Sequence, residues 1–326
     1  MKTKVHAGVD TGTDGGVRGG HRPPAVDWAE QETTMKHVID IQDLSATEIQ
    51  DLYDRTDDMK AHPAEYASAL ANETLIMLFA KPSTRTRVSF EAGMTELGGH
   101  AIYFSQDQSQ LSRGESLKDT AKVLSRYAGG IMARLFEHET MVELGKHADV
   151  PVINGLTDLL HPCQALSDVY TLRERGLDDG PLAFVGDGNN VAHSLMQICA
   201  TLDIPCRIAT PEGYEPDQEI IERVADADVR VTNDPVEAVD GAKAVYTDVF
   251  VSMGDEESKK ADFDGFQVNE DLMAHSDDAV FMHCLPAHRD EEVSAPVMDG
   301  PKSIVYDQAE NRQHVQKAIL YTVWDN

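Results

Sequence analysis

The window 81–87 reads Lys-Pro-Ser-Thr-Arg-Thr-Arg and holds three cations and no anion. It lies between an apolar run at 75–79, which predicts a strand, and a helical pattern from 84 to 97. At such a junction, free backbone N–H groups, the positive end of the helix dipole and two arginine forks converge on one point. The window therefore predicts a phosphate site, with an ordinary capped helix start carrying surface arginines as the alternative.

A histidine and a glutamine stand one turn apart in His-Pro-Cys-Gln, residues 161–164, which opens a predicted helix from 162 to about 175. At a helix N-terminus, both His161 and Gln164 could donate hydrogen bonds to a carbonyl oxygen. Arg134, in the predicted strand 131–135, would reach the same edge of the sheet. A structural loop histidine and a solvated strand-end arginine are the alternatives.

An acid and a thiol follow two predicted strands: Asp248 comes after the run 244–247, and Cys284 lies near the end of the run 280–285. At neighbouring strand ends, such a pair could orient an amine and take its proton. A glycine turn beside a buried cysteine is the alternative. The adjacent His283 also raises a metal site, but consecutive strand residues point to opposite faces, so this pair is not expected to share an ion.

The segment 184–191, Phe-Val-Gly-Asp-Gly-Asn-Asn-Val, begins like a dinucleotide-binding turn. However, the third glycine of that motif falls at Val191, and the next predicted strand ends near Thr210 without a carboxylate for a ribose hydroxyl. An NAD-dependent oxidoreductase is therefore an alternative that rests on a partial motif. The asparagine pair 189–190 offers amide groups suited to an amino-acid backbone.

Short apolar runs alternate with helix-period segments along most of the chain. This alternation predicts an α/β fold with two doubly wound parallel-sheet domains, joined by long helices and closed by a C-terminal helix. The length of 326 residues agrees, because one core rarely grows beyond about 250 to 300 residues. We expect a disordered extension (1–34), a first domain (35–168), a second domain (169–306) and a C-terminal helix (307–326) that packs back on the first domain. The strands are predicted at 75–79, 101–104, 131–135, 150–153, 182–185, 206–209, 229–232, 244–247 and 280–285.

The chain carries 57 acidic against 28 basic residues, which gives a formal charge of −29 and a pI of about 4.6. Nucleic acids and anionic membranes would repel such a chain, so small-molecule ligands are expected. Because the charge is spread among regular apolar runs, we interpret it as the surface of a folded protein adapted to salt. At about 1 M salt the Debye length falls to roughly 3 Å, which weakens the self-repulsion.

The four cysteines show no Cys-x-x-Cys spacing, and the hydrophobic runs are too short to span a bilayer. Neither a disulfide framework, nor a zinc site, nor a membrane anchor is expected. The first 34 residues lack the charged and apolar regions of a signal peptide. The interpretation is a cytoplasmic protein.

Together, four motifs resemble one family. Ser-Thr-Arg-Thr-Arg (83–87), His-Pro-Cys-Gln (161–164), Asp-x-x-x-Ser-Met-Gly (248–254) and His-Cys-Leu-Pro (283–286) stand in the order found in the aspartate/ornithine carbamoyltransferase superfamily. The last two are typical of its ornithine branch. The resemblance implies transfer of a carbamoyl group from carbamoyl phosphate to the side-chain amine of L-ornithine, giving L-citrulline and phosphate in arginine or urea-type metabolism. It implies no metal and no organic cofactor; putrescine or aspartate as acceptor is the alternative within the superfamily.

The resemblance also implies roles for individual residues. The first domain would bind carbamoyl phosphate, the second would bind ornithine, and the functional unit would be a homotrimer or a multiple of trimers, with sites at subunit interfaces. Gln110 would reach the neighbouring subunit's site, although the sequence around it departs from the common family pattern. Catalysis would fall to Cys284, Asp248, Arg134 and His161. The implied carbamoyl phosphate ligands are Ser83, Thr84, Arg85, Thr86, Gln110, Arg134, His161, Gln164, Cys284, Leu285 and Arg312, and the implied ornithine ligands are Asn190, Asp248, Ser252 and Met253.

Overall fold

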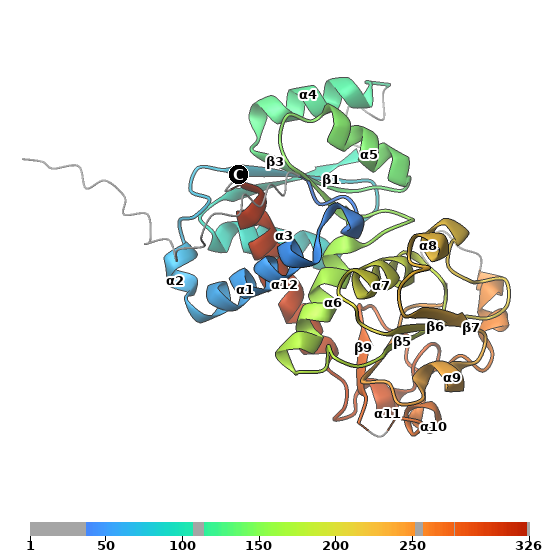
Figure 1. Ribbon diagram of the computed structural model, residues 1–326. Helices are drawn as coiled ribbons and strands as arrows, with labels where there is room; N and C mark the ends of the chain where they lie inside the picture. The colour runs from blue at the N-terminus through green and yellow to red at the C-terminus, as the bar shows by residue number, and fades with distance from the viewer. Residues whose placement is uncertain (1–36, 107–113, 252–256, 277, 325–326) are drawn as a thin grey trace, which may run out of the picture. The chain divides into compact units, whose positions relative to one another are not determined.

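The structure, a computed structural model, describes residues 37–106, 114–251, 257–276 and 278–324, and their strands form two sheets (Figure 1). The first sheet has the order β2-β1-β3-β4 and the second the order β7-β6-β5-β8-β9. Every neighbouring pair of strands is parallel. The predicted α/β class with two parallel sheets is therefore confirmed. The predicted disordered extension, 1–34, lies outside the described residues.

Helices cover both faces of the first sheet. Helices α4 and α5 lie on one face, while α3, α1 and α12 lie on the other (Figure 1). Two short elements, η1 (Ile41–Asp43) and α2 (Pro63–Tyr66), flank α1. The bounds are β1 Thr74–Phe79, β2 His100–Ser105, β3 Gly130–Arg134, β4 Val152–Leu156, α1 Ala46–Ala61, α3 Thr84–Glu96, α4 Leu117–Tyr127, α5 His138–His147 and α12 Val305–Trp324.

The second sheet is also covered on both faces, with α7 on one side and α9 on the other (Figure 1). Its strand β9 ends two residues earlier than predicted, because the chain turns out of the sheet after His283 and Leu285 adopts a φ of 61°. The bounds are β5 Leu182–Val185, β6 Cys206–Ala209, β7 Val229–Thr232, β8 Ala244–Thr247, β9 Val280–His283, α7 Asn190–Thr201, α8 Gln218–Arg223, α9 Pro235–Val239, η4 Glu257–Phe263, α10 Glu270–Met273 and α11 Ala295–Met298.

Helix α6 (Pro162–Glu174) joins the two sheets. It follows β4 of the first sheet, contacts α7 of the second, and residues 162–172 of it are all buried. One hydrophobic cluster runs from Met77 in β1 through Leu166 in α6 to Phe184 in β5. Because burial of apolar surface is the main favourable term in folding, this shared core holds α6 against both sheets.

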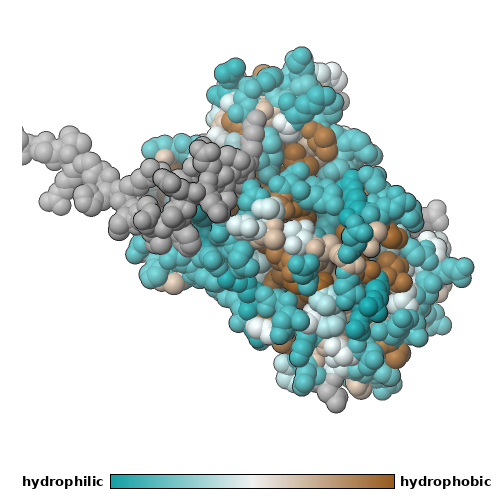
Figure 2. Space-filling view, in the orientation of Figure 1, coloured by the Kyte–Doolittle hydropathy of each residue, from teal (hydrophilic) through white to brown (hydrophobic). Residues whose placement is uncertain are grey.

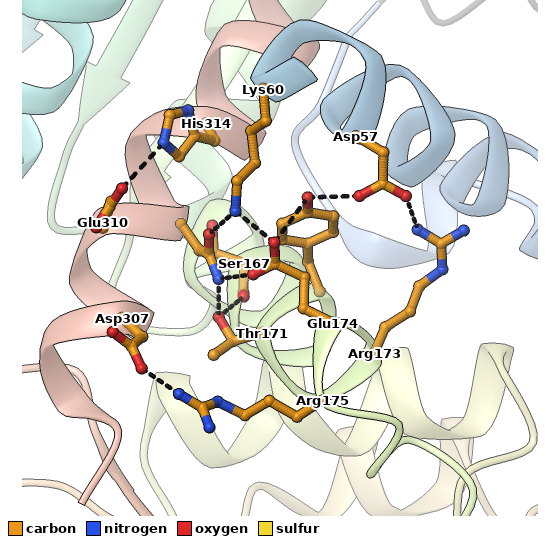
Figure 3. Close-up of polar contacts among 12 residues, drawn as sticks. Asp57, Lys60, Ser167, Thr171, Arg173, Glu174, Arg175, Asp307, Glu310 and His314 are labelled. Carbon is orange, nitrogen blue, oxygen red and sulfur yellow. Dashed lines mark hydrogen bonds and ion pairs between the residues drawn. The ribbon is translucent and has the colours of Figure 1, made fainter.

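Polar contacts tie α6 to α1 and α12 (Figure 3). Lys60 of α1 forms an ion pair with Glu174 of α6 and donates to Asn311 Oδ1 of α12 at 2.8 Å. Asn311 Nδ2 in turn donates to Thr171 Oγ1 of α6 at 3.1 Å. Asn311 is only 2% exposed, so these bonds satisfy a buried amide and hold the three helices in one arrangement.

The strand order places two switch points at the carboxyl ends of the sheets. In the first sheet the chain continues from β1 to β2 on one side and to β3 on the other, and in the second sheet β6 and β8 flank β5 in the same way. Ligands of open parallel sheets bind in the crevices at such points. Arg134 ends β3, Asp248 directly follows β8, and the segment 81–87 follows β1. Within the described residues, no helix is long and apolar enough to cross a membrane.

Candidate active site

A cavity of about 950 Å³ lies where strand ends of the two sheets meet. It brings together most of the residues singled out in the sequence, although these are spread over more than 200 positions. Thr86 does not line the cavity, but its hydroxyl accepts a hydrogen bond from Arg312, which does. Gln110, Ser252 and Met253 lie outside the described residues. The predicted residues that line the cavity are Ser83, Thr84, Arg85, Arg134, His161, Gln164, Asn190, Asp248, Cys284, Leu285 and Arg312.

Helix α3 points its N-terminus at the cavity. Ser83 caps the helix, since its Oγ accepts a hydrogen bond from Thr86 N at 3.2 Å. The backbone N–H groups of Thr84 and Arg85 have no acceptor within the helix, because the first turn of any helix lacks one. These groups and the positive end of the helix dipole make this end of the cavity a site for an anion.

Three guanidinium groups surround the same space. Arg85, Arg134 and Arg312 form no ion pair with any described residue, and the Nε atoms of Arg134 and Arg312 are buried without a hydrogen-bond partner there. Arg312 Nη2 donates to Thr86 Oγ1 at 2.6 Å, which aims the side chain from α12 into the site. Burial, followed by the nearby charge of Arg312, lowers the pKa of Arg134 to about 10, so the group is still cationic at neutral pH. One buried and two half-buried cations without a carboxylate partner among the described residues favour an anionic ligand.

The other two cations of the window 81–87 have partners in the chain. Lys81 forms an ion pair with Asp158 and lies 4.5 Å from the ring centroid of Phe136. Arg87 Nε lies 2.9 Å from Glu91 Oε1, and the Arg87 guanidinium lies over the Tyr103 ring. Arg85 is therefore the cation of this window that is left for a ligand.

His161 and Gln164 offer opposite kinds of hydrogen bond. Burial, assisted by the charges of Arg312 and Arg134, lowers the pKa of His161 well below its usual value, so its ring is neutral and carries one N–H donor. Gln164 Nε2 donates to Asp168 Oδ1 at 2.8 Å, and its buried Oε1 accepts no hydrogen bond from the described residues. Gln164 therefore offers a buried acceptor oxygen, and one of the two hydrogens of its NH₂ group is engaged by Asp168. Donation from Gln164 to a carbonyl oxygen stays a prediction.

On the other side of the cavity, the carboxylate of Asp248 receives two hydrogen bonds. Cys284 Sγ donates to Oδ1 at 3.1 Å, and Asn189 Nδ2 donates to Oδ2 at 3.1 Å. Burial, together with the negative charge of Asp248, raises the pKa of the Cys284 thiol well above its usual value. The thiol of Cys284 is thus protonated at neutral pH.

The turn after Cys284 is held by a histidine behind it. Leu285 N donates to His283 Nδ1 at 2.9 Å, so the proton of this ring is on Nε2, which lies 3.2 Å from Glu292 Oε1. The expectation that His283 and Cys284 point apart is wrong, because their ligand atoms and that of Asp248 lie within 4.8 Å of one another. Both nitrogens of His283 already have hydrogen-bond partners, so this ring is not free to ligate an ion and the cluster does not fit a resident metal ion.

The glycine-rich turn after β5 packs against protein rather than against a nucleotide. A Cβ atom at Gly188 would lie 2.3 Å from Pro216 N, so the chain at 214–216 fills the space above the turn. Asn190, at the start of α7, donates to Thr157 O at 2.6 Å and so links this turn to the segment that follows β4. Neither feature favours the dinucleotide alternative, in which a pyrophosphate approaches the glycine backbone closely.

Lys259 is a cavity residue that the sequence patterns did not single out. It lies in η4 and donates from Nζ to Asp187 Oδ2 at 2.7 Å, where both residues line the cavity. The sequence feature that could have marked Lys259 as a site residue is its position a few residues after the motif 248–254. A lysine in a polar stretch that also holds Lys260 has no periodicity to mark it, so only its folded position makes Lys259 a cavity residue.

The fold and the site define an α/β protein with a site for an anion at the strand ends of two parallel sheets, beside the Asp248–Cys284 pair. Residues 36–174 match the family described as "Aspartate/ornithine carbamoyltransferase, carbamoyl-P binding domain", and residues 178–323 match "Aspartate/ornithine carbamoyltransferase, Asp/Orn binding domain". The chain belongs to the aspartate/ornithine carbamoyltransferase family, as its four motifs predicted.

Individual relatives agree along most of the chain. The chain is 63% identical over 293 residues to the catabolic ornithine carbamoyltransferase of Halobacterium salinarum, which covers 89% of this chain and 99% of the relative. It is 49% identical over 300 residues to the ornithine carbamoyltransferase of Bacillus subtilis, with 88% and 93% covered. Among solved structures, the ornithine carbamoyltransferase of Pyrococcus furiosus aligns with a TM-score of 0.85 at 46% identity, over 89% of this chain and 97% of that chain. The resemblance to the ornithine branch is confirmed.

Proposed function

We propose that this protein transfers the carbamoyl group of carbamoyl phosphate to the side-chain amine of L-ornithine, giving L-citrulline and phosphate. The observation that carries the proposal is the cavity in which Arg85, Arg134 and Arg312 face a ligand site and have no carboxylate partner among the described residues, beside the hydrogen-bonded pair Asp248 and Cys284. The relatives named ornithine carbamoyltransferase support this choice of substrates.

Carbamoyl phosphate binds with its phosphate at the N-terminus of α3, where Ser83, Thr84 and Arg85 supply backbone and side-chain donors. Its carbonyl oxygen lies toward Arg134 and the N–H of the neutral His161. As the amine attacks, negative charge grows on this oxygen, and donors placed in advance stabilise it. Loss of one such donor in other enzymes costs about 2.7 to 4 kcal/mol.

L-Ornithine binds on the other side, through Asp248 and Asn190 and through the motif residues Ser252 and Met253. Asp248 pairs with the α-amino group, and Cys284 lies beside the reacting amine. An alkyl amine has a pKa near 10.4, so a proton must leave before attack. The protonated thiol of Cys284 is a poor base, so we assign it to positioning. The ornithine ammonium gives its first proton to solvent. The new C–N bond then forms as the C–O bond to phosphate breaks, and the departing phosphate takes the second amine proton and leaves as hydrogen phosphate.

The proposal divides the chain as the motifs do: 35–168 binds carbamoyl phosphate, 169–306 binds ornithine, and 307–326 returns to the first part. We further propose a homotrimer, or a multiple of it, in which Gln110 reaches a neighbouring site. The edge strand β2 supports an interface here, because Ile102 and Tyr103 on it are 44% and 37% exposed and Val88 nearby on α3 is 55% exposed.

We also propose that the protein is cytoplasmic and takes part in arginine metabolism. We propose further that it is active at high salt concentration and needs neither a metal ion nor an organic cofactor. The net charge of −29 supports the proposal that the protein works at high salt concentration. The largely hydrophilic face in Figure 2 agrees with this proposal. The recessed arginines sit inside this acidic shell and are screened by salt less than the exposed charges are.

The proposal is tested by offering the full-length protein, in molar KCl, carbamoyl phosphate with ornithine, putrescine or aspartate in parallel assays. Citrulline should form from ornithine, and putrescine should react far more slowly because it lacks the α-amino acid group that Asp248 reads. Faster reaction of putrescine or aspartate would overturn the choice of acceptor. Tight binding of NAD without any carbamoyl transfer would favour the oxidoreductase alternative.

A further inference from the structure

Asp168 stands at the centre of a buried chain of hydrogen bonds directly behind the cavity. It lies on α6, one turn after Gln164, and is fully buried. Its Oδ1 accepts from Gln164 Nε2 at 2.8 Å and from Gln308 Nε2 of α12 at 2.7 Å. Gln308 Oε1 accepts from His283 N at 2.9 Å, one residue before Cys284. This series of hydrogen bonds therefore connects Gln164, a cavity residue on α6, to the end of β9.

A carboxylate is an unusual choice for this position, since burial disfavours its charge. What distinguishes it from other polar side chains is that, when ionised, it can only accept hydrogen bonds. Gln164 must therefore turn its NH₂ group toward Asp168. The opposite orientation would place the amide oxygen against the carboxylate and lose the bond.

Gln308 makes the arrangement rigid. Its own orientation is set because the N–H of His283 can only donate, so Gln308 must present Oε1 to His283 and Nε2 to Asp168. Gln308 Nε2 also donates to the hydroxyl of Tyr246 at 3.1 Å. Together these contacts hold Asp168 Oδ1 where Gln164 meets it.

Gln164 lines the cavity, and its Oε1 is left as a buried acceptor without a partner among the described residues. A ligand group that donates an N–H satisfies it, whereas a methyl group leaves it buried and unpaired. An unpaired buried acceptor lowers affinity by about 10- to 100-fold. We propose that Asp168 is a positioning residue that holds Gln164 with its amide oxygen toward the cavity, and that the site thereby selects acyl phosphates whose acyl carbon bears an NH₂ group over those that bear a methyl group.

This inference rests on the proposed function and assigns to Asp168 the selection of the carbamoyl donor. Two stable probes of matched shape test it: phosphonoacetamide, which carries the NH₂ group, and 2-oxopropylphosphonate, which carries a methyl group instead. Titration calorimetry on the full-length protein in molar KCl measures the affinity of each. The wild type should bind phosphonoacetamide about 10- to 100-fold more tightly.

Three variants separate positioning from mere structural support. Asp168→Ala removes the acceptor, so Gln164 can turn over, and the preference for the NH₂ probe should fall to about threefold or less. Asp168→Asn keeps an acceptor oxygen, which Gln308 holds in place, so the preference should be retained. Thr171→Val cuts a hydrogen bond between the same two helices one turn further along α6 (Figure 3), so it should lower the melting temperature and leave the preference unchanged.

The outcomes are distinct. A folded Asp168→Ala protein that keeps the full preference would overturn the inference, as would an Asp168→Asn protein that loses it to the same extent as Asp168→Ala. If Asp168→Ala does not fold, the Asp168→Asn variant still tests the inference. Loss of the preference for phosphonoacetamide in Asp168→Asn would contradict the role of Asp168 as a hydrogen-bond acceptor. A wild type that shows the preference but forms no citrulline would count against the proposed function and not against Asp168.

Discussion

Cys284 Sγ lies 3.1 Å from Asp248 Oδ1 and donates a hydrogen bond to it. The two residues are 36 positions apart, and strand register brings them together: Thr247 of β8 pairs with His283 of β9, so the next residue of each strand leaves the sheet at the same level. A thiol is thus held on a buried carboxylate at the edge of the cavity. The chemistry of each residue depends on the other.

Replacing Asp248 with Asn should make Cys284 more reactive. Burial and then the negative charge of Asp248 raise the pKa of the thiol, so removing the charge lowers this pKa and increases the thiolate fraction at pH 8. We expect iodoacetamide to alkylate Cys284 severalfold faster in Asp248→Asn than in the wild type, while turnover with ornithine falls. The other three cysteines are buried and should stay unmodified. Slower alkylation in the variant would contradict the coupling.

Cys284→Ala should separate turnover from donor binding. The thiol contacts Asp248 and not the N-terminus of α3, so the phosphate end of the site is left intact. We expect turnover to fall about 100-fold or more, with the affinity for carbamoyl phosphate changed less than about threefold. Steady-state kinetics together with titration of the phosphonate probe measure both. Equal losses in turnover and donor affinity would show that Cys284 mainly holds the donor.

Arg85→Ala should abolish turnover, because it removes the one cation of the window 81–87 that has no ion-pair partner among the described residues. The expected loss is at least 100- to 1,000-fold in citrulline formation. Arg87→Ala is the matched control, since Arg87 is held by Glu91 and Tyr103, and its loss should be about tenfold or less. Citrulline production at the wild-type rate by Arg85→Ala would refute the site.

The acidic surface should make stability depend on salt. At about 0.1 M salt the Debye length is roughly 10 Å and the net charge of −29 repels itself, whereas at about 1 M it is roughly 3 Å. Urea unfolding in KCl should show a higher midpoint at 1 M than at 0.1 M. Sucrose, which is excluded from the surface without screening charge, is the control and should not reproduce the effect fully. Equal midpoints at the two salt concentrations would rule out salt adaptation.

Asp168 should destabilise the fold as its proton leaves. Burial, opposed by the hydrogen bonds from Gln164 and Gln308, raises its pKa from 3.8 to about 6. The folded state therefore holds the proton more tightly than the unfolded state, and stability is lost as pH rises from about 4 to 6. Asp168→Asn removes this term, so its unfolding free energy relative to wild type should grow by up to about 3 kcal/mol between pH 4 and pH 7. A difference that is constant with pH would contradict the shift.

Local sequence patterns were sufficient to predict much of the secondary structure, the fold class and the family of this protein. The alternation of apolar runs and helical periods predicts both parallel sheets, because strand and helix periods are properties of neighbouring residues. The cap at Ser83 and the start of α6 at Pro162 follow from residue types at fixed offsets. The motifs indicate the family, and most of their residues line one cavity.

What tertiary structure alone decided is which partner each polar group meets. Lys81 and Arg87 stand beside Arg85 in the sequence, yet only the fold gives them Asp158 and Glu91 and leaves Arg85 for a ligand. Residue type allows Gln164 to donate or to accept, and only the contact with Asp168 fixes which way its amide is turned. The physical reason is that a hydrogen bond or ion pair depends on distance and direction between segments that the sheet order brings together. A pattern of neighbouring residues carries no information about either.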